Sequence, residues 1–235
     1  MNQYSQEKTK SKLRRIYKFC GLAKHALDSL ERKRIKICTG SDINDPFDVL
    51  PYLDLHGTSH EYLIQLRDTV FSRFGFISFS RNWENPLLWS HYCDNHRGIC
   101  LGFDIWDDDK IVDIDYVKSR PDELRWKGIS IKEGRTRFSV MAADIFRYKM
   151  AEWRYENECR TIEELPSRDI VSGLYFRNFK DSQLKLKEVI IGAHCEVPFE
   201  DIKSILPTNS DVKIIKAGLN LRQFQVANKD KLEPH

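Results

Sequence analysis

Three charged side chains alternate along one short segment of the chain, YENECRTI at residues 155–162. In a strand, residues two apart point to the same face, so Glu156, Glu158 and Arg160 would line one side. Two neighbouring carboxylates repel each other, which raises the pKa of one of them, and Arg160 offsets the repulsion. Such a row can orient a ligand hydroxyl or stabilise a cation. It can equally form a solvent-facing ion network between strands.

A second group of candidates lies in the segment WSHY. Trp89, Tyr92 and Cys93 share one helical face through i, i+3 and i+4 spacing, which is typical of core packing. His91 lies off that face. One interpretation is a histidine that bonds to backbone groups, and the other makes it a candidate binding residue together with Tyr92. His91, Cys93 and His96 do not have a common zinc-ligand spacing, and no second ligand cluster follows, so no metal is expected.

The third group is the turn NDPFD at residues 44–48. Asn and Asp side chains in turns bond back to their own backbone, so one interpretation is a self-capped turn with Phe47 packed into the core. The alternative is that Asn44 or Asp45 lines a pocket.

The elements that must position these groups follow one another irregularly. The chain has no βαβ rhythm, no glycine-rich phosphate loop and no internal linker, which favours an α+β fold. We expect a single domain with a split, largely antiparallel sheet and flanking helices. Asn85 followed by Pro86 predicts a capped helix start, and Thr58 with Glu61 predicts another. Strands are expected at 15–20, 75–80, 98–104, 111–117 and 155–162, and helices at 22–33, 86–93 and 137–153.

The expected domain covers residues 15–220. A basic N-terminal tail at 1–14, for which disorder is one option, precedes it, and a polar C-terminal tail at 221–235 follows. The basic tail could make a weak contact with nucleic acid.

The composition excludes several classes of protein. The net charge is +3, from 38 basic and 35 acidic side chains, which argues against a protein that mainly neutralises a phosphate backbone. No apolar run approaches the ~20 residues that span a bilayer, and no secretory signal is seen, so no membrane partner is expected. Six cysteines lie far apart and form no C-x-x-C pair, which predicts reduced thiols and a cytoplasmic location.

Taken in order, these motifs make the chain resemble an uncharacterised bacterial protein family of unknown function. The resemblance covers about residues 15–195 and implies no established activity by itself. The motifs that carry it are IYKF at 16–19, NDPFD at 44–48, SFS at 78–80, WSHY at 89–92, HRGICLGF at 96–103 and WRYENECR at 153–160.

The order of parts is also similar to that of the ADP-ribosyltransferase fold. That fold uses an Arg or His on its first strand to hold NAD, then a serine strand, and late in the chain a Glu-x-Glu pair or lone Glu. Here Lys18 stands at the Arg or His position, as a point charge without the planar fork of Arg. Ser78 and Ser80 match the serine strand, and Glu156 and Glu158 match the pair. The resemblance implies that Glu158 binds a ribose hydroxyl and stabilises the oxocarbenium-like transition state.

This resemblance implies an NAD-dependent ADP-ribosyltransferase or an NAD glycohydrolase-like enzyme, acting as a stress or phage-defence effector. NAD would be its substrate, and the acceptor macromolecule stays open. The catalytic candidates are Glu158, Glu156 and Lys18. The binding candidates are Ser78, Ser80, Tyr17, Asn44, Asp45, His91, Tyr92 and Arg160.

Two other functions compete with this one. The first is a non-catalytic nucleotide-binding module, in which Trp83, Trp89 and Tyr92 stack on a base. The second is an RNA-directed hydrolase that uses His91 and the acidic strand as acid and base.

Overall fold

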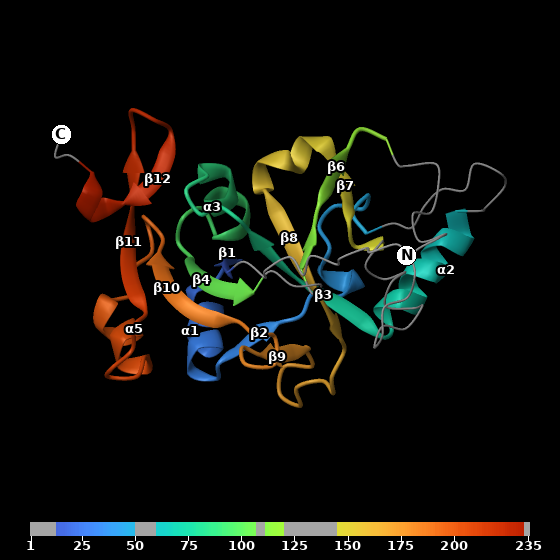
Figure 1. The fold of residues 1–235 in the computed structure, drawn as a ribbon, viewed down its shortest axis with the longest axis horizontal. Helices are drawn as coiled ribbons and strands as arrows, with labels where there is room; N and C mark the ends of the chain where they lie inside the picture. The colour runs from blue at the N-terminus through green and yellow to red at the C-terminus, as the bar shows by residue number, and fades with distance from the viewer. Residues whose placement is uncertain (1–12, 50–59, 107–110, 120–144, 233–235) are drawn as a thin grey trace, which may run out of the picture.

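A computed structural model of the protein describes residues 13–49, 60–106, 111–119 and 145–232 (Figure 1). Its largest element is an eight-stranded sheet in the order β12-β11-β10-β4-β1-β3-β8-β5, in which all neighbours are antiparallel except β10 and β11. The strands are β1 (Leu13–Cys20), β3 (Phe74–Ser80), β4 (Ile99–Trp106), β5 (Ile111–Asp113), β8 (Glu158–Glu164), β10 (Lys185–Ile191), β11 (Lys213–Asn220) and β12 (Gln225–Asn228). The prediction of an α+β fold with a large, mostly antiparallel sheet is confirmed.

The sheet is split between β1 and β3. β1 pairs with β4 along its whole length, and β3 pairs with β8 along its whole length. Within the described residues, β1 meets β3 at one pair alone, Tyr17 and Ser80. Beyond that pair the two strands diverge, and Cys38 takes up a place beside β3 by bridging to Phe76. The divergence leaves a wedge in the middle of the sheet.

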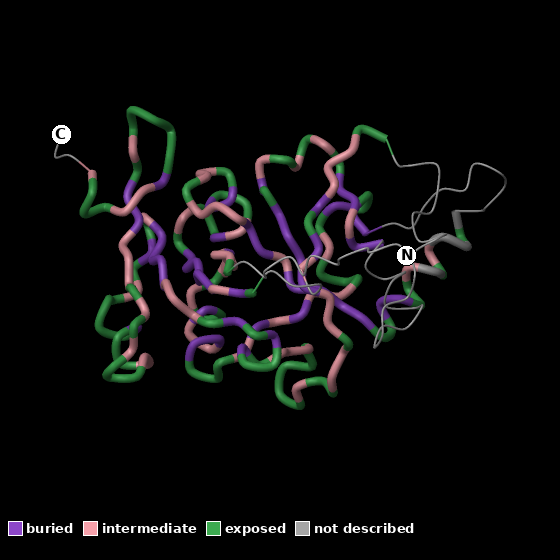
Figure 2. Tube along the Cα trace, in the orientation of Figure 1, coloured by how far each residue is buried: buried purple, intermediate pink, exposed green. Residues whose placement is uncertain are grey.

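Helices cover both faces of the sheet because its strands alternate their apolar side chains. On β4, Leu101 packs into the cluster that includes Leu30 of α1 (Ala23–Glu31), while Cys100 packs into the cluster that includes Trp89 of α3 (Pro86–Tyr92). The buried segments in Figure 2 accordingly run along the central strands. The remaining helices of the described chain are α2 (His60–Phe71), α5 (Phe199–Ile205) and the 3-10 helices η1 (Gly40–Asp42), η2 (Ala151–Glu156) and η3 (Lys229–Lys231).

The start of α3 confirms the helix start that was predicted at Asn85 and Pro86. Asn85 is the N-cap, its side chain accepts from the backbone N–H of Leu87 at 2.9 Å, and Pro86 is the first helical residue. The predicted cap at Thr58 lies outside the described residues.

The region before β8 differs from the prediction. Of the helix expected at 137–153, residues 137–144 lie outside the described residues. Residue 145 is helical, a turn follows at 146–147, and the remainder forms β7 (Tyr148–Met150) and then η2. β7 pairs in parallel with β6 (Asp115–Val117), and this tertiary pairing outweighs the helical pattern. The strand expected at 111–117 is likewise divided into β5 and β6, because β5 pairs with β8.

The strand expected to begin at Tyr155 begins at Glu158 instead. Tyr155 and Glu156 belong to η2, and Asn157 ends η2 with a left-handed φ of 46°. Asn tolerates this conformation better than most residues, so it suits the abrupt turn into β8.

Both ends of the expected domain also shift. β1 begins at Leu13, inside the expected N-terminal tail, and residues 1–12 lie outside the described part. At the other end, β12 pairs with β11, so the sheet continues past residue 220. A two-stranded sheet of β2 (Arg34–Lys36) and β9 (Phe176–Asn178) completes the fold.

All six cysteines carry free thiols. Among the described helices, none has the length and apolar character needed to cross a membrane.

Candidate functional site

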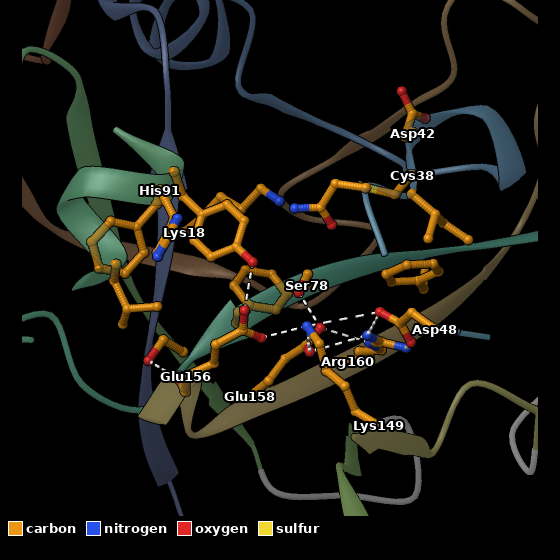
Figure 3. Close-up of a pocket in the computed structure, with 18 of the residues that line it drawn as sticks. Lys18, Cys38, Asp42, Asp48, Ser78, His91, Lys149, Glu156, Glu158 and Arg160 are labelled. Atoms are coloured by element: carbon orange, nitrogen blue, oxygen red, sulfur yellow. Dashed lines mark hydrogen bonds and ion pairs between the residues drawn. The ribbon is translucent and has the colours of Figure 1, made fainter. Parts of the chain in front are cut away.

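A cavity of about 290 Å³ opens at the wedge between β1 and β3 (Figure 3). This volume lies near the lower end of the range for small-molecule sites, roughly 300–1,000 Å³. All of the candidate residues except Asp45 line the cavity. They are Tyr17, Lys18, Asn44, Ser78, Ser80, His91, Tyr92, Glu156, Glu158 and Arg160.

The pairing of β3 with β8 brings four of these residues onto one face. Ser78 lies opposite Arg160, and Ser80 lies opposite Glu158. Side chains directly opposite each other in an antiparallel pair share a face. The Ser78 hydroxyl donates to Oε1 of Glu158, across the two strands.

Ser80 has a different role from Ser78. Its hydroxyl lies 2.6 Å from the backbone carbonyl oxygen of Glu156 and 2.8 Å from that of Asn82, and it accepts from the N–H of Asn82 at 3.1 Å. Ser80 therefore fixes the turns on either side of the site, and its hydroxyl is already used by the backbone.

The floor of the cavity is a buried cluster of three carboxylates and two cations, which we call the ionic cluster: Asp48, Lys149, Glu156, Glu158 and Arg160. Arg160, 1% exposed, donates to both carboxylate oxygens of Asp48 at 3.1 and 2.7 Å. It also donates to both oxygens of Glu158, at 2.6 and 3.0 Å. Lys149 bonds to Glu156 and, at 3.1 Å, to Glu158.

Glu156, Glu158 and Arg160 were expected to line one face of a strand. The structure brings them together, although Glu156 comes from η2 rather than from β8. It also shows that the group is buried, so the interpretation as a solvent-facing ion network is wrong.

Glu158 and Glu156 have opposite pKa shifts. Burial raises the pKa of Glu158, but Arg160 and Lys149 lower it by more, to about 2. Burial also raises the pKa of Glu156; Lys149 offsets this in part, and the charge of Glu158 adds to it, so the pKa stays above its ordinary value. Two carboxyl groups whose pKa values are pushed apart are typical of acid and base pairs in active sites.

Lys149 stays cationic within the cluster. Burial lowers the pKa of its ammonium group, but the carboxylates of Glu158, Asp48 and Glu156 together raise it above its ordinary value. The cluster therefore carries one net negative charge when every member is ionised.

Lys18 is placed differently from the two cations of the cluster. It comes from β1, across the wedge from β8, and it is half-buried. Its ammonium group makes no hydrogen bond or ion pair with the part of the chain that the structure describes, and Figure 3 shows it away from the dashed network around Arg160. The cavity thus has a negative floor and, on the opposite wall, a positive charge that no described side chain neutralises.

The NDPFD turn contributes two residues to the site, one that the sequence analysis predicted and one that it did not. Asn44 lines the cavity, while Asp45 accepts from the N–H of Phe47 at 2.8 Å and so caps its own turn. Phe47 is 64% exposed, which contradicts the expected core position. Asp48 points inward instead and binds Arg160, a role that the sequence analysis missed. Lys149 was missed as well.

The aromatic residues separate into core and cavity groups. Trp89 is fully buried, with its ring packed edge-on against Phe19 and Trp83, so it cannot stack on a base as the nucleotide-binding interpretation required. Tyr92 lines the cavity, and its hydroxyl donates to Oε1 of Glu156. His91 also lines the cavity.

The three residues considered for zinc lie in different surroundings. His91 lies at the cavity, Cys93 is buried in the core, and His96 stacks on Trp89 with ring centroids 6.1 Å apart. Among the described residues, no group of three or more His, Cys, Asp or Glu side chains could hold a metal ion.

One family model, described as "Protein of unknown function (DUF2971)", matches residues 88–161, which are 74 of the chain's 235 residues. The matched segment contains His91, Tyr92 and most of the ionic cluster, but neither Lys18 nor Ser78. The match supports the predicted resemblance to an uncharacterised family. No curated protein and no solved structure matches the chain.

Proposed function

We propose that the protein consumes NAD by cleaving the bond between nicotinamide and ribose, as an ADP-ribosyltransferase or an NAD glycohydrolase. One observation carries the proposal. Lys18, Ser78 and Glu158 come from three distant segments, and they surround one cavity on the neighbouring strands β1, β3 and β8. These are the residues to which the resemblance assigned NAD binding and catalysis.

The charge distribution of the cavity supports this substrate. The nicotinamide ring of NAD is a cation, and the ribose attached to it leads to an anionic pyrophosphate. A negative floor at Glu158 suits the cationic ring. The ammonium group of Lys18, which has no ion pair within the described ranges, suits a phosphate oxygen.

The environment of Glu158 supports the chemistry. When the C–N bond breaks, its electron pair leaves with nicotinamide, which becomes neutral, and positive charge develops on the ribose. An ionised carboxylate held in place beforehand stabilises that charge without reorganisation. The acceptor, either water or a nucleophile on a macromolecule, then bonds to the ribose carbon and releases a proton.

A ribose hydroxyl can reach Glu158 by replacing Ser78. Among the described residues, the Glu158 carboxylate accepts from Ser78, from Lys149 and from two nitrogens of Arg160. Of these, the Ser78 hydroxyl is the neutral one and can rotate away, so it marks the position that a ribose hydroxyl would take.

The direct test is a titration of the protein with NAD, following thermal stability and nicotinamide release together. Binding to the native state raises the melting temperature. Release of nicotinamide would establish turnover, and its product, ADP-ribose or a modified macromolecule, would distinguish the two reactions. The absence of both NAD binding and nicotinamide release would contradict the proposal.

Lys18→Gln should weaken NAD binding about tenfold, because a charged hydrogen bond to phosphate is lost. The melting temperature of the free protein should change little, since Lys18 has no ion pair among the described residues. Lys24→Gln, the same change at an exposed position on α1, is the matched control. Equal NAD affinity in the two variants would contradict the assigned role of Lys18.

The reduced dinucleotide NADH should bind roughly tenfold more weakly than NAD, because its nicotinamide ring is neutral and gains nothing from the negative floor. Competition between the two forms for the cavity measures the ratio. Cys38 is partly exposed and lines the cavity, so a bound ligand should protect its thiol from alkylation. The rate of alkylation therefore reports occupancy of the cavity. Equal affinity for the two forms would contradict the electrostatic argument.

A non-catalytic nucleotide-binding module is the second candidate. The observation that favours it is that every carboxylate of the ionic cluster already has a cationic partner, as in a structural ion network. Saturable NAD binding without nicotinamide release, with or without added cell extract as a source of acceptors, would support the binding module over the enzyme.

A further inference from the structure

Three aromatic rings meet just outside the cavity, and we call them the aromatic rim: His91, Trp153 and Tyr155. The ring centroid of His91 lies 6.2 Å from that of Trp153 and 6.2 Å from that of Tyr155, and the last two are 5.9 Å apart. His91 lines the cavity, whereas the cavity lining does not include the other two rings. The rim therefore adjoins the wall of the cavity at His91.

The rim is held from both sides. The side-chain amide of Asn85, the N-cap of α3, donates to the backbone carbonyl of Tyr155 at 3.0 Å, which joins α3 to η2. On the inner side, the ammonium group of Lys149 lies 5.2 Å from the ring centroid of Trp153. These contacts fix the rim relative to the ionic cluster. His91 is exposed, and Trp153 and Tyr155 are half-buried, so the rings can still receive a ligand.

The size of the cavity leaves part of a dinucleotide outside. A volume of about 290 Å³ suits one small ligand, and NAD consists of two complete nucleotides. If the nicotinamide end occupies the cavity between Lys18 and Glu158, the second nucleoside must lie beyond the mouth. His91 is an exposed residue of the cavity lining and also a member of the rim, so the rim lies within reach.

We propose that the aromatic rim is the binding site for the adenine base of the dinucleotide. This inference rests on the proposed function and assigns the second half of its substrate. Stacking on aromatic side chains suits any nucleobase, because each has a π face, and loss of one ring typically costs about tenfold or more in affinity.

The test compares the affinities of NAD and nicotinamide mononucleotide, which lacks the adenosine half, by calorimetry. The unaltered protein should bind NAD at least about tenfold more tightly than nicotinamide mononucleotide. Tyr155→Leu should remove most of that preference by weakening NAD alone, and Tyr155→Phe, which keeps the ring, should retain it. Phe224→Leu is the control, as it removes an exposed ring on the hairpin between β11 and β12.

Each outcome decides between the two proposals. Equal affinity for NAD and nicotinamide mononucleotide in the unaltered protein would overturn the rim assignment even if Tyr155→Leu failed to fold. Tight NAD binding that Tyr155→Leu leaves unchanged would overturn the rim assignment and leave the proposed function standing. Absence of binding by both ligands would overturn the proposed function, and the rim assignment with it.

Discussion

Glu158→Gln is expected to lower the rate of nicotinamide release from NAD by about a thousandfold, because the amide cannot supply the negative charge that stabilises the ribose cation. The amide oxygen of Gln can still accept from Ser78 and Arg160. Its NH2 group would replace the oxygen that accepts from Lys149 and from a second nitrogen of Arg160, so these two contacts are lost and the fold of the variant has to be checked. NAD affinity should fall far less than the rate. A steady-state assay of released nicotinamide, with kcat and KM determined separately, measures both.

The control for this variant is Glu164→Gln, the same change at the exposed end of the same strand. It should leave nicotinamide release unaltered. Thermal melting with bound NAD shows whether Glu158→Gln is folded under the conditions of the assay. A folded Glu158→Gln variant with the activity of the unaltered protein would remove Glu158 from the mechanism.

The second large effect concerns stability. Arg160→Met should lower the free energy of unfolding by about 3–5 kcal/mol, because it leaves the buried carboxylates of Asp48 and Glu158 without their main cation. Urea unfolding followed by fluorescence measures the change. Arg177→Met is the control: Arg177 pairs with Glu163 in a partly exposed position, where an ion pair contributes at most about 1 kcal/mol. Equal losses in the two variants would contradict the importance of the ionic cluster.

The pH dependence of that loss identifies its cause. The folded pKa of Glu158 is lowered to about 2 from its ordinary value of 4.5, so its ion pairs stabilise the protein fully above pH 4.5. The contribution disappears as the pH falls toward 2. Arg160→Met lacks the main source of the lowering, so the stability gap between the two proteins should narrow as the pH falls through this range. A gap that stays constant with pH would point to lost packing instead.

The parts of the fold that could be predicted have local causes. Asn85 and Pro86 define the start of α3 by themselves, because a cap needs only a few neighbouring residues. The alternation in β1 and β3 also lies within single segments. The segment that contains Lys149 could not be predicted in this way, since its strand depends on pairing with β6, more than thirty residues earlier.

In the candidate site, too, the residues with local causes could be predicted and those that depend on distant partners could not. Glu158 and Arg160 were identified from spacing alone, because both lie on one strand. The role of Asp48 could not be predicted, because its partner Arg160 is 112 residues away. The Asp residues of the NDPFD segment were also accounted for by turn formation alone. The catalytic and binding roles of the cavity residues stay predictions, as does the use of NAD.

Among the described residues, the seam between the two halves of the eight-stranded sheet is the single pair of Tyr17 and Ser80. Local opening of a protein begins where few backbone hydrogen bonds must break, so this seam should exchange its amide hydrogens faster than the ladders on either side. Lys18 lies on one side of the seam and Glu158 on the other. A ligand bound by both residues would link the two sides of the sheet. Slower hydrogen exchange at the seam would then report binding, whether or not the protein cleaves the ligand.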